Sequence, residues 1–187
     1  FHPTNPQIVY AETQNGGIVV SEDGGQFFDG ATEGIDDEDR RNWDMPYIIS
    51  KHFPSILYTG TYRVYRNTSG ALPNWEPISP DLTDGLILHP RFHTITTLDE
   101  SGLNPSLLYV GTTDGNISRT QDGGQNWENV SDGLPKRYIT SVKVSDTFED
   151  HVYVTLSGYK DNDSSPRVHR STDRGETWEA LSNNLPN

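Results

Sequence analysis

The 187-residue chain contains no cysteine, one methionine and few basic residues. The missing cysteine excludes a disulfide framework, a thiolate zinc site, an iron–sulfur cluster and a cysteine nucleophile. The 14 basic side chains are outnumbered by 27 acidic ones, which gives a formal net charge of −13. Nucleic acid and anionic lipid both require a Lys/Arg surface, so we expect neither as a partner and favour a cationic or neutral one.

Long apolar runs are also missing. The longest, such as residues 18–20 and 86–88, fall far short of the roughly 20 residues that a membrane-spanning helix needs, so we predict no membrane insertion. Hydrophobic residues make up only 32% of the chain, yet they include 4 Trp, 9 Tyr and 6 Phe. This mixture favours half-buried strands over long helices.

A repeat of about 50 residues runs through the whole chain, at a period typical of stacked structural units. Two landmarks recur in each unit, an apolar run around a tyrosine and then a second aromatic residue. They are Tyr10 and Phe28, Tyr58 and Trp75, Tyr109 and Trp127, and Tyr153 and Trp178. Because two independent markers keep one register, the repeat predicts four similar structural units.

Short strands separated by turn residues make up each unit. In the last unit they are expected at residues 138–145, 151–156, 168–171 and 177–181, and Gly, Asn, Asp and Pro interrupt the chain too often for a long helix. Four short strands at this period are typical of a β-propeller blade. A β-sandwich is the less favoured alternative, because a sandwich does not require near-identical units.

A polar turn precedes three of the four aromatic landmarks, at residues 21–28, 120–127 and 171–178, and we call it the turn motif. Its Asp can accept hydrogen bonds from the backbone N–H groups of the turn, and a Gly two residues later can take the positive φ that the turn requires. The final aromatic side chain then anchors in the apolar layer. We predict a structural role for the motif residues Ser21, Asp23, Gly25, Phe28, Thr120, Asp122, Gly124, Trp127, Ser171, Asp173, Gly175 and Trp178.

The spacing Ser/Thr-x-Asp-x-Gly-x-Thr-Trp resembles the Asp-box of BNR-repeat β-propellers, a group that includes bacterial sialidases, xyloglucanase-like glycoside hydrolases and sortilin-type receptors. The copy at residues 171–178 matches at every position, whereas the first departs at Phe27 and Phe28, the second departs at Asn126, and residues 66–70 have lost the Asp. The resemblance implies an all-β propeller segment over residues 1–187, with approximate blades at 1–36, 37–84, 85–135 and 136–187. It also implies a secreted or cell-surface bacterial protein. Asp-boxes specify a fold and not a reaction.

The register of the units predicts that the first blade lacks its innermost strand, because the chain opens where the other units have just finished theirs. We therefore expect part of a longer propeller, with the remaining blades of the parent chain as partners. A closed four-bladed ring is the less favoured alternative.

The predicted function is a module for ligand or protein binding, or for scaffolding, without a complete active site in this segment. The alternative is part of a xyloglucanase-like glycoside hydrolase acting on neutral polysaccharide, which needs two carboxylates about 5 to 9.5 Å apart. Asp44, Asp99 and Asp114 lie near strand ends, but the sequence cannot select a pair among 27 acids. A sialidase is disfavoured, because the sequence shows neither the arginine cluster of that family nor its Arg-Ile-Pro element ahead of the first turn motif.

Propellers usually bind through the loops at one end of the channel, which this register places at the second-to-third strand turns and at the connections between blades. The candidate binding residues in these loops are Trp43, Tyr62, Arg63, Asp114, Tyr138 and Tyr159. Trp43 and Tyr138 occupy equivalent places before an innermost strand. An aromatic side chain there can stack on a sugar or a peptide, or can cap the interface between blades, and both interpretations stay open.

The acidic run at residues 36–39 is the strongest local departure from the repeat. Its carboxylates suit a hard cation, and Asp36, Asp37 and Asp39 are candidate calcium ligands. The favoured interpretation is a solvated charge run neutralised by Arg40 and Arg41, so no cofactor is expected.

Two further metal patterns fail. The segment beginning at Asp161 resembles an EF-hand loop but has Pro166 where glycine is required. His89 and His93 are four residues apart, but Pro90 lies between them, and we expect no zinc site.

Overall fold

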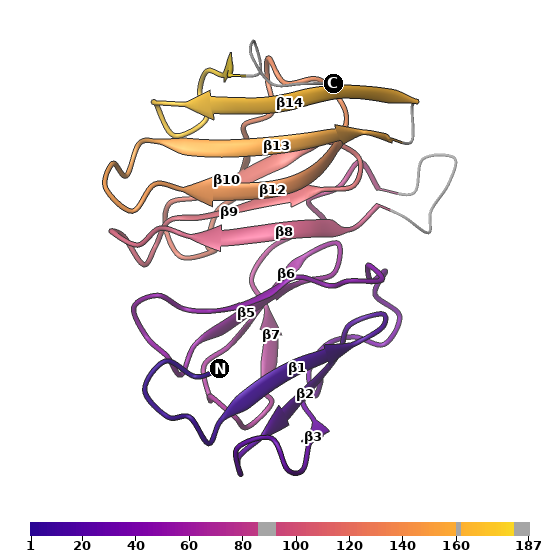
Figure 1. The fold of residues 1–187 in the computed structure, drawn as a ribbon, viewed down its shortest axis with the longest axis vertical. Coiled ribbons are helices and arrows are strands. Elements are labelled where there is room, and N and C mark those ends of the chain that lie inside the picture. Colours follow the sequence, from indigo (N-terminus) through magenta and orange to yellow (C-terminus); the bar gives the residue numbers. More distant parts are fainter. Residues whose placement is uncertain (86–92, 160–161, 182–187) are drawn as a thin grey trace.

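The structure is a computed structural model of the chain, and it describes residues 1–85, 93–159 and 162–181. His89 and Asp161 lie outside the described residues. Within these ranges, fifteen strands form four antiparallel sheets, which follow one another along the long axis of the molecule in the order of the sequence (Figure 1). Across the described ranges, no helix has the length and apolar composition needed to cross a membrane.

The first sheet has three strands and each of the others has four. The strands of the first two sheets are β1 (Val9–Thr13), β2 (Gly17–Ser21) and β3 (Asp29–Gly30), then β4 (Tyr47–Ile49), β5 (Leu57–Gly60), β6 (Val64–Asn67) and β7 (Trp75–Pro77). Those of the last two sheets are β8 (Ile95–Glu100), β9 (Leu108–Thr112), β10 (Ile117–Thr120) and β11 (Glu128–Asn129), then β12 (Tyr138–Val144), β13 (Val152–Gly158), β14 (Asp163–Ser171) and β15 (Glu179–Ala180).

Every sheet is a meander, because its strands pair in the order in which they occur in the chain. Within the described residues, the first sheet lacks the counterpart of β4, β8 and β12. This is the innermost strand that the sequence register predicts to be missing from the first unit.

Three apolar clusters fill the spaces between adjacent sheets. Tyr10 and Leu57 belong to the cluster between the first and second sheets, Tyr58 and Leu108 to the next, and Tyr109 to the last. Successive residues of a strand therefore enter different clusters, because side chains alternate between the two faces of a sheet. Each inner sheet is covered on both faces, which explains why β5, β9 and β10 are buried along their whole length.

Two glycines permit the close approach of neighbouring sheets. A Cβ atom on Gly111, near the end of β9, would lie 2.4 Å from Ile139 Cγ2 of β12. Gly60 holds the equivalent place at the end of β5, where a Cβ atom would lie 2.7 Å from Ile95 Cγ2 of β8. The recurring Tyr-x-Gly sequence thus places a glycine where the next innermost strand crosses.

Candidate binding face

The loops at one end of the sheets are joined to one another by backbone hydrogen bonds. Asn15 N donates to Trp43 O at 2.9 Å, Leu82 N donates to Tyr62 O at 3.0 Å, and Thr113 N donates to Thr94 O at 2.9 Å. Each bond links a second-to-third strand turn with a connection between sheets. We call this end of the molecule the crossover face.

The turn motif lies at the opposite ends of the strands and is a self-contained hydrogen-bonded unit. Ser171 Oγ donates to Asp173 Oδ1 at 2.6 Å and accepts from Gly175 N at 2.7 Å, while Asp173 Oδ1 also accepts from Thr177 N at 2.9 Å. Hydrogen bonds from Ser171 and Thr177 lower the pKa of Asp173 to about 2. The same contacts recur among Ser21, Asp23 and Gly25 and among Thr120, Asp122 and Gly124. These polar groups are committed to the turn.

Asn67 replaces the missing motif in the second sheet. Its Nδ2 donates to Gly70 O at 2.9 Å and to Leu72 O at 3.1 Å, and its Oδ1 accepts from Ser69 N at 2.8 Å. One amide side chain therefore stabilises the turn that Ser or Thr and Asp share elsewhere.

The motif tryptophans fasten each sheet to the preceding one. Trp127 Nε1 donates to Ile78 O at 2.8 Å, and Trp178 Nε1 donates to Val130 O at 2.8 Å. Trp75 makes the equivalent bond to Ala31 O at 2.7 Å. Phe28 stands in this position in the first sheet, has no donor, and is 42% exposed.

Asp39 turns inward from the acidic run and is almost fully buried, with a side chain that is 2% exposed. It accepts hydrogen bonds from Thr61 Oγ1 at 2.9 Å, from Tyr65 Oη at 2.7 Å, and from Arg63 Nη2 at 2.9 Å. Burial would raise the pKa of Asp39, but the bonds from Arg63, Tyr65 and Thr61 outweigh it and lower that pKa. The carboxylate is therefore charged and fully engaged.

The structure does not assemble the candidate calcium site. Asp39 is neutralised by Arg63, the Asp36 carboxylate lies 3.5 Å from the same guanidinium, and the Asp37 side chain is 100% exposed. Within the described ranges, no group of three or more His, Asp or Glu side chains could hold a metal ion. Of the two arginines expected to neutralise the run, Arg41 does pair with Asp37, at 3.5 Å. Arg40 instead pairs with Asp81 at 2.7 Å, and Arg63 pairs with Asp36 and Asp39.

Two guanidinium groups contact the ring of Tyr62. Arg40 Cζ lies 4.2 Å from the centroid of the Tyr62 ring, and Arg63 Cζ lies 5.3 Å from it. Arg40 is itself fixed by Asp81 Oδ2 at 2.7 Å. Cation–π contacts of this kind hold an aromatic ring in one orientation. The half-buried ring of Tyr62 is thus pre-organised on the crossover face.

Asp114 has an acceptor with no partner. Its side chain is 7% exposed and its Oδ2 accepts from Asp84 N at 2.6 Å, but Oδ1 has no hydrogen-bond partner among the described residues. The Asp84 carboxylate is paired, with Asn116 Nδ2 at 2.8 Å and Lys136 Nζ at 3.0 Å. These two contacts, Asn116 first, lower the pKa of Asp84.

Glu12 is the carboxyl of the crossover face whose pKa is raised. Its Oε1 accepts from Met45 N at 2.7 Å, and its neighbour Asp44 is exposed. Burial raises the pKa of Glu12, and the charge of Asp44 adds to the rise against the opposing effect of the Met45 N–H donor. Asp99, by contrast, is buried among the innermost strands, where it accepts from Lys143 Nζ at 3.1 Å and Val144 N at 2.9 Å.

The candidate binding residues do not form one cluster. Tyr62 and Arg63 lie together, and Asp114 joins the neighbouring connection through Asp84. Tyr138 is half-buried at the start of β12, Trp43 is 63% exposed beside the β1–β2 turn, and Tyr159 is 88% exposed near the end of β13.

Sequence reasoning missed the groups that position these side chains, which are Arg40, Asp81, Asp84, Asn116 and Lys136. The Arg40–Asp81 contact spans 41 residues and the Lys136–Asp84 contact spans 52. Only the repeat register, which places their loops at one end, could have brought them together.

No protein-family model matches the sequence, and no curated protein resembles it closely enough to count as a relative. Solved structures do resemble the fold. A GH74 enzyme from Niastella koreensis matches with a TM-score of 0.70 and 17% identity, over 96% of this chain and 28% of that one. The fold is that of a β-propeller segment. The all-β prediction is therefore confirmed, and we refer to the four sheets as blades.

Two other kinds of protein share the fold. An auxiliary nutrient binding protein from Bacteroides thetaiotaomicron matches with a TM-score of 0.61 and 10% identity, over 96% of this chain and 40% of that one. YCF48 from Cyanidioschyzon merolae matches with a TM-score of 0.60 and 14% identity, over 94% of this chain and 53% of that one, and a YCF48 structure with a bound D1 peptide matches at 0.51. The chain thus spans about a quarter to just over half of the length of the GH74 enzyme, the nutrient binding protein and the Cyanidioschyzon YCF48.

Proposed function

We propose that this chain is a binding module of a secreted or cell-surface propeller protein, which holds a protein or neutral polysaccharide ligand on its crossover face without catalysing a reaction. The pre-organised ring of Tyr62 carries the proposal. A ring that Arg40 and Arg63 hold in one orientation can contact a sugar or a peptide side chain through its uncovered part without further loss of side-chain freedom.

The state of the neighbouring carboxylates supports binding over catalysis. A general acid requires a carboxyl with a raised pKa, whereas hydrogen bonds and ion pairs lower the pKa values of Asp39 and Asp84. Among the neighbours in fold, one is named for nutrient binding and one is solved with a peptide, so ligand binding has a precedent on this architecture.

The test is a binding screen of the full-length protein on arrays of neutral glycans and peptides, followed by calorimetry on the best ligand. We expect Tyr62→Ala to weaken binding at least about tenfold, because a central aromatic contact contributes more than about 1.4 kcal/mol. Tyr159→Ala is the matched control, since Tyr159 is 88% exposed and lies on the fourth blade. Equal affinities for the wild type and Tyr62→Ala would refute the proposal.

The second candidate function is part of a glycoside hydrolase acting on neutral polysaccharide. Glu12 favours it, because a half-buried carboxyl with a raised pKa beside the exposed Asp44 has the protonation behaviour of a general acid. The likeness in fold to a GH74 enzyme is compatible with this function. Release of reducing sugar from a neutral β-glucan by the full-length protein, abolished by Glu12→Gln, would establish the hydrolase and displace the binding proposal.

A further inference from the structure

The repeat places three arginines in equivalent positions, each one residue before the end of the third strand of its blade. They are Arg66 on β6, Arg119 on β10 and Arg170 on β14. Each is paired in register with a glutamate on the outermost strand, namely Glu76, Glu128 and Glu179. The three sites therefore begin from the same sequence pattern.

Carboxylates occupy two of these sites. Arg119 Nη2 lies 2.6 Å from Glu128 Oε2 and 2.6 Å from Glu176 Oε1, and the Arg119 side chain is 4% exposed. Its Nη1 also donates to Arg174 O, in the turn motif of the next blade, at 2.7 Å. Arg170 pairs with Glu179.

Arg66 keeps the backbone contact but has no carboxylate. Its Nη1 donates to Gly123 O at 3.4 Å, and Gly123 holds the place in the third blade that Arg174 holds in the fourth. Among the described residues, no Asp or Glu pairs with Arg66, and Glu76 is exposed. The counterpart of Glu176 is Gln125, a neutral amide. At the position where an acid covers Arg119, the site of Arg66 therefore has an amide.

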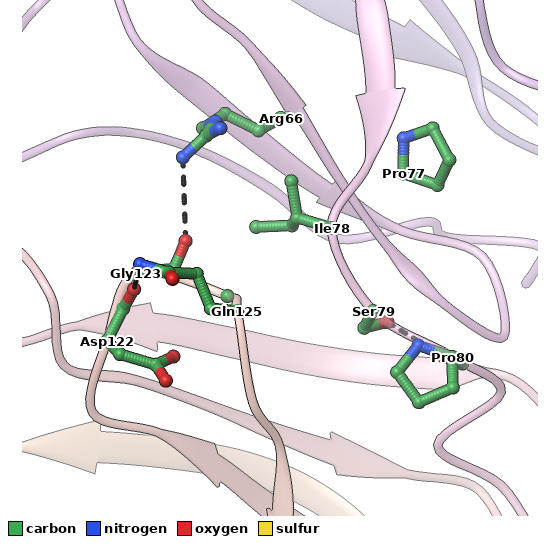
Figure 2. A pocket seen from close by; sticks show the side chains of 9 residues that line it. Arg66, Pro77, Ile78, Ser79, Pro80, Asp122, Gly123 and Gln125 are labelled. Atoms are coloured by element: carbon green, nitrogen blue, oxygen red, sulfur yellow. Dashed lines mark hydrogen bonds between the residues drawn. The ribbon is translucent and has the colours of Figure 1, made fainter.

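A cavity of about 570 Å³ opens where the missing carboxylate would lie. Figure 2 shows Arg66 pointing toward Gly123, with Gln125 in the same loop and with Pro77 and Pro80 across the opening. The walls thus combine one guanidinium with the apolar side chains of Pro77, Ile78 and Pro80. Ser79 and the Asp122 carboxylate also line the cavity, and the hydrogen bonds of the Asp122 carboxylate are made within its own turn.

We propose that this cavity, at the outer edge of the seam between the second and third blades, binds the carboxylate of an acidic side chain from a partner polypeptide. Arg66 is the anchor. The Gln125 amide nitrogen donates one hydrogen to Asp122 O at 3.2 Å, and its other hydrogen is the second donor. Glu176 and Glu128, each 2.6 Å from Arg119 Nη2, show that a carboxylate fits beside the arginine at this position. A guanidinium group can also hold a single carboxylate through two parallel bonds. The apolar wall of Pro77, Ile78 and Pro80 suits the methylene groups of a glutamate. This site is separate from the ring of Tyr62 and does not depend on the function proposed above.

The test follows the side-chain Nε–Hε signals of the arginines by NMR while an acetylated tetrapeptide containing two glutamates is added to the full chain at physiological ionic strength. We expect a saturable shift of the Arg66 signal and none of the Arg119 signal, because Glu128 and Glu176 already occupy Arg119. Gln125→Glu should weaken the peptide at least about tenfold by supplying an internal carboxylate. Glu76→Gln is the matched control, and it should bind at least as tightly as the wild type.

Three results would overturn the proposal. The first is the absence of a saturable Arg66 shift in the wild type. The second is an unchanged affinity in Gln125→Glu when its NMR spectrum shows a folded chain. The third is tighter binding of digalacturonate than of the tetrapeptide, which would assign the cavity to an acidic sugar instead of a polypeptide.

Discussion

At the scale of single residues, the buried carboxylate of Asp39 holds several side chains of the crossover face in place. A run of four acids in the sequence does not show which carboxylate turns inward, because its neutralising partner Arg63 lies 24 residues away. The Ser or Thr, Asp and Gly contacts of the turn motif are different, since each of them joins residues at most four apart. Their geometry could therefore be predicted from spacing alone, whereas the environment of Asp39 could not.

Removing the Asp39 carboxylate should destabilise the fold. We expect Asp39→Ala to lower the free energy of unfolding by about 2 to 4 kcal/mol, less than for a fully buried pair because the Arg63 side chain is 24% exposed. The pKa of Asp39 is lowered in the folded state, so its contribution is present above the unfolded pKa of about 3.8 and is lost as the pH falls through the folded value.

Urea unfolding of the wild type and Asp39→Ala between pH 7 and pH 2.5 checks this prediction. The difference between the two proteins should be constant near neutrality and should narrow below about pH 4. Asp37→Ala is the control, because its side chain is 100% exposed. A difference that grows on acidification would contradict the assigned ion pair.

At the scale of strands and sheets, the sequence predicted well what depends on local periodicity. The tyrosine runs became β1, β5, β9 and β13, and the first blade has three strands. The contacts that join one blade to the next lie tens of residues apart, as from Trp127 to Ile78 across 49 residues. Periodicity predicts such an aromatic residue to be buried but cannot identify the carbonyl that it meets.

Gly111 tests the packing of innermost strands. A Cβ atom there would lie 2.4 Å from Ile139 Cγ2 and 3.0 Å from Thr97 Cγ2, so Gly111→Ala must push β12 away from β9. We expect a loss of about 1 to 3 kcal/mol in the free energy of unfolding. Chemical denaturation measures it, with Gly30→Ala as the control because a Cβ atom at Gly30 would meet nothing within 4 Å. Equal losses in the two variants would show that the close approach is misplaced.

At the scale of the whole molecule, we expect the motif tryptophans to stabilise the packing of each blade on the preceding one. Trp127→Phe keeps most of the apolar contact but leaves Ile78 O without its donor at the seam between the second and third blades. We expect it to lower the free energy of unfolding by about 1 to 3 kcal/mol. Trp43→Phe, at a 63% exposed side chain, should change little. Similar denaturation midpoints for Trp127→Phe and the wild type would contradict the role of the indole N–H.

The repeated fold and the residues that depart from the repeat contribute different parts of the crossover face. The repeat predicts which loops meet at the crossover face, since all blades share one register. The repeat does not predict that Arg40 contacts the Tyr62 ring, because Arg40 lies in a connection that has no counterpart of similar composition elsewhere in the chain. Sites on repeat folds arise where one copy departs from the others, and such departures are visible only when contacts across the copies are compared.

The most direct test of a ligand site on the crossover face is amide chemical-shift mapping of the full chain with the best ligand from the glycan and peptide screen. We predict that perturbed signals concentrate at residues 61–63, 81–84 and 113–116, and that they disappear in Tyr62→Ala while that variant remains folded. Shifts confined to the opposite end, at residues 50–56 and 101–107, or shifts that persist unchanged in Tyr62→Ala, would contradict this placement of the site.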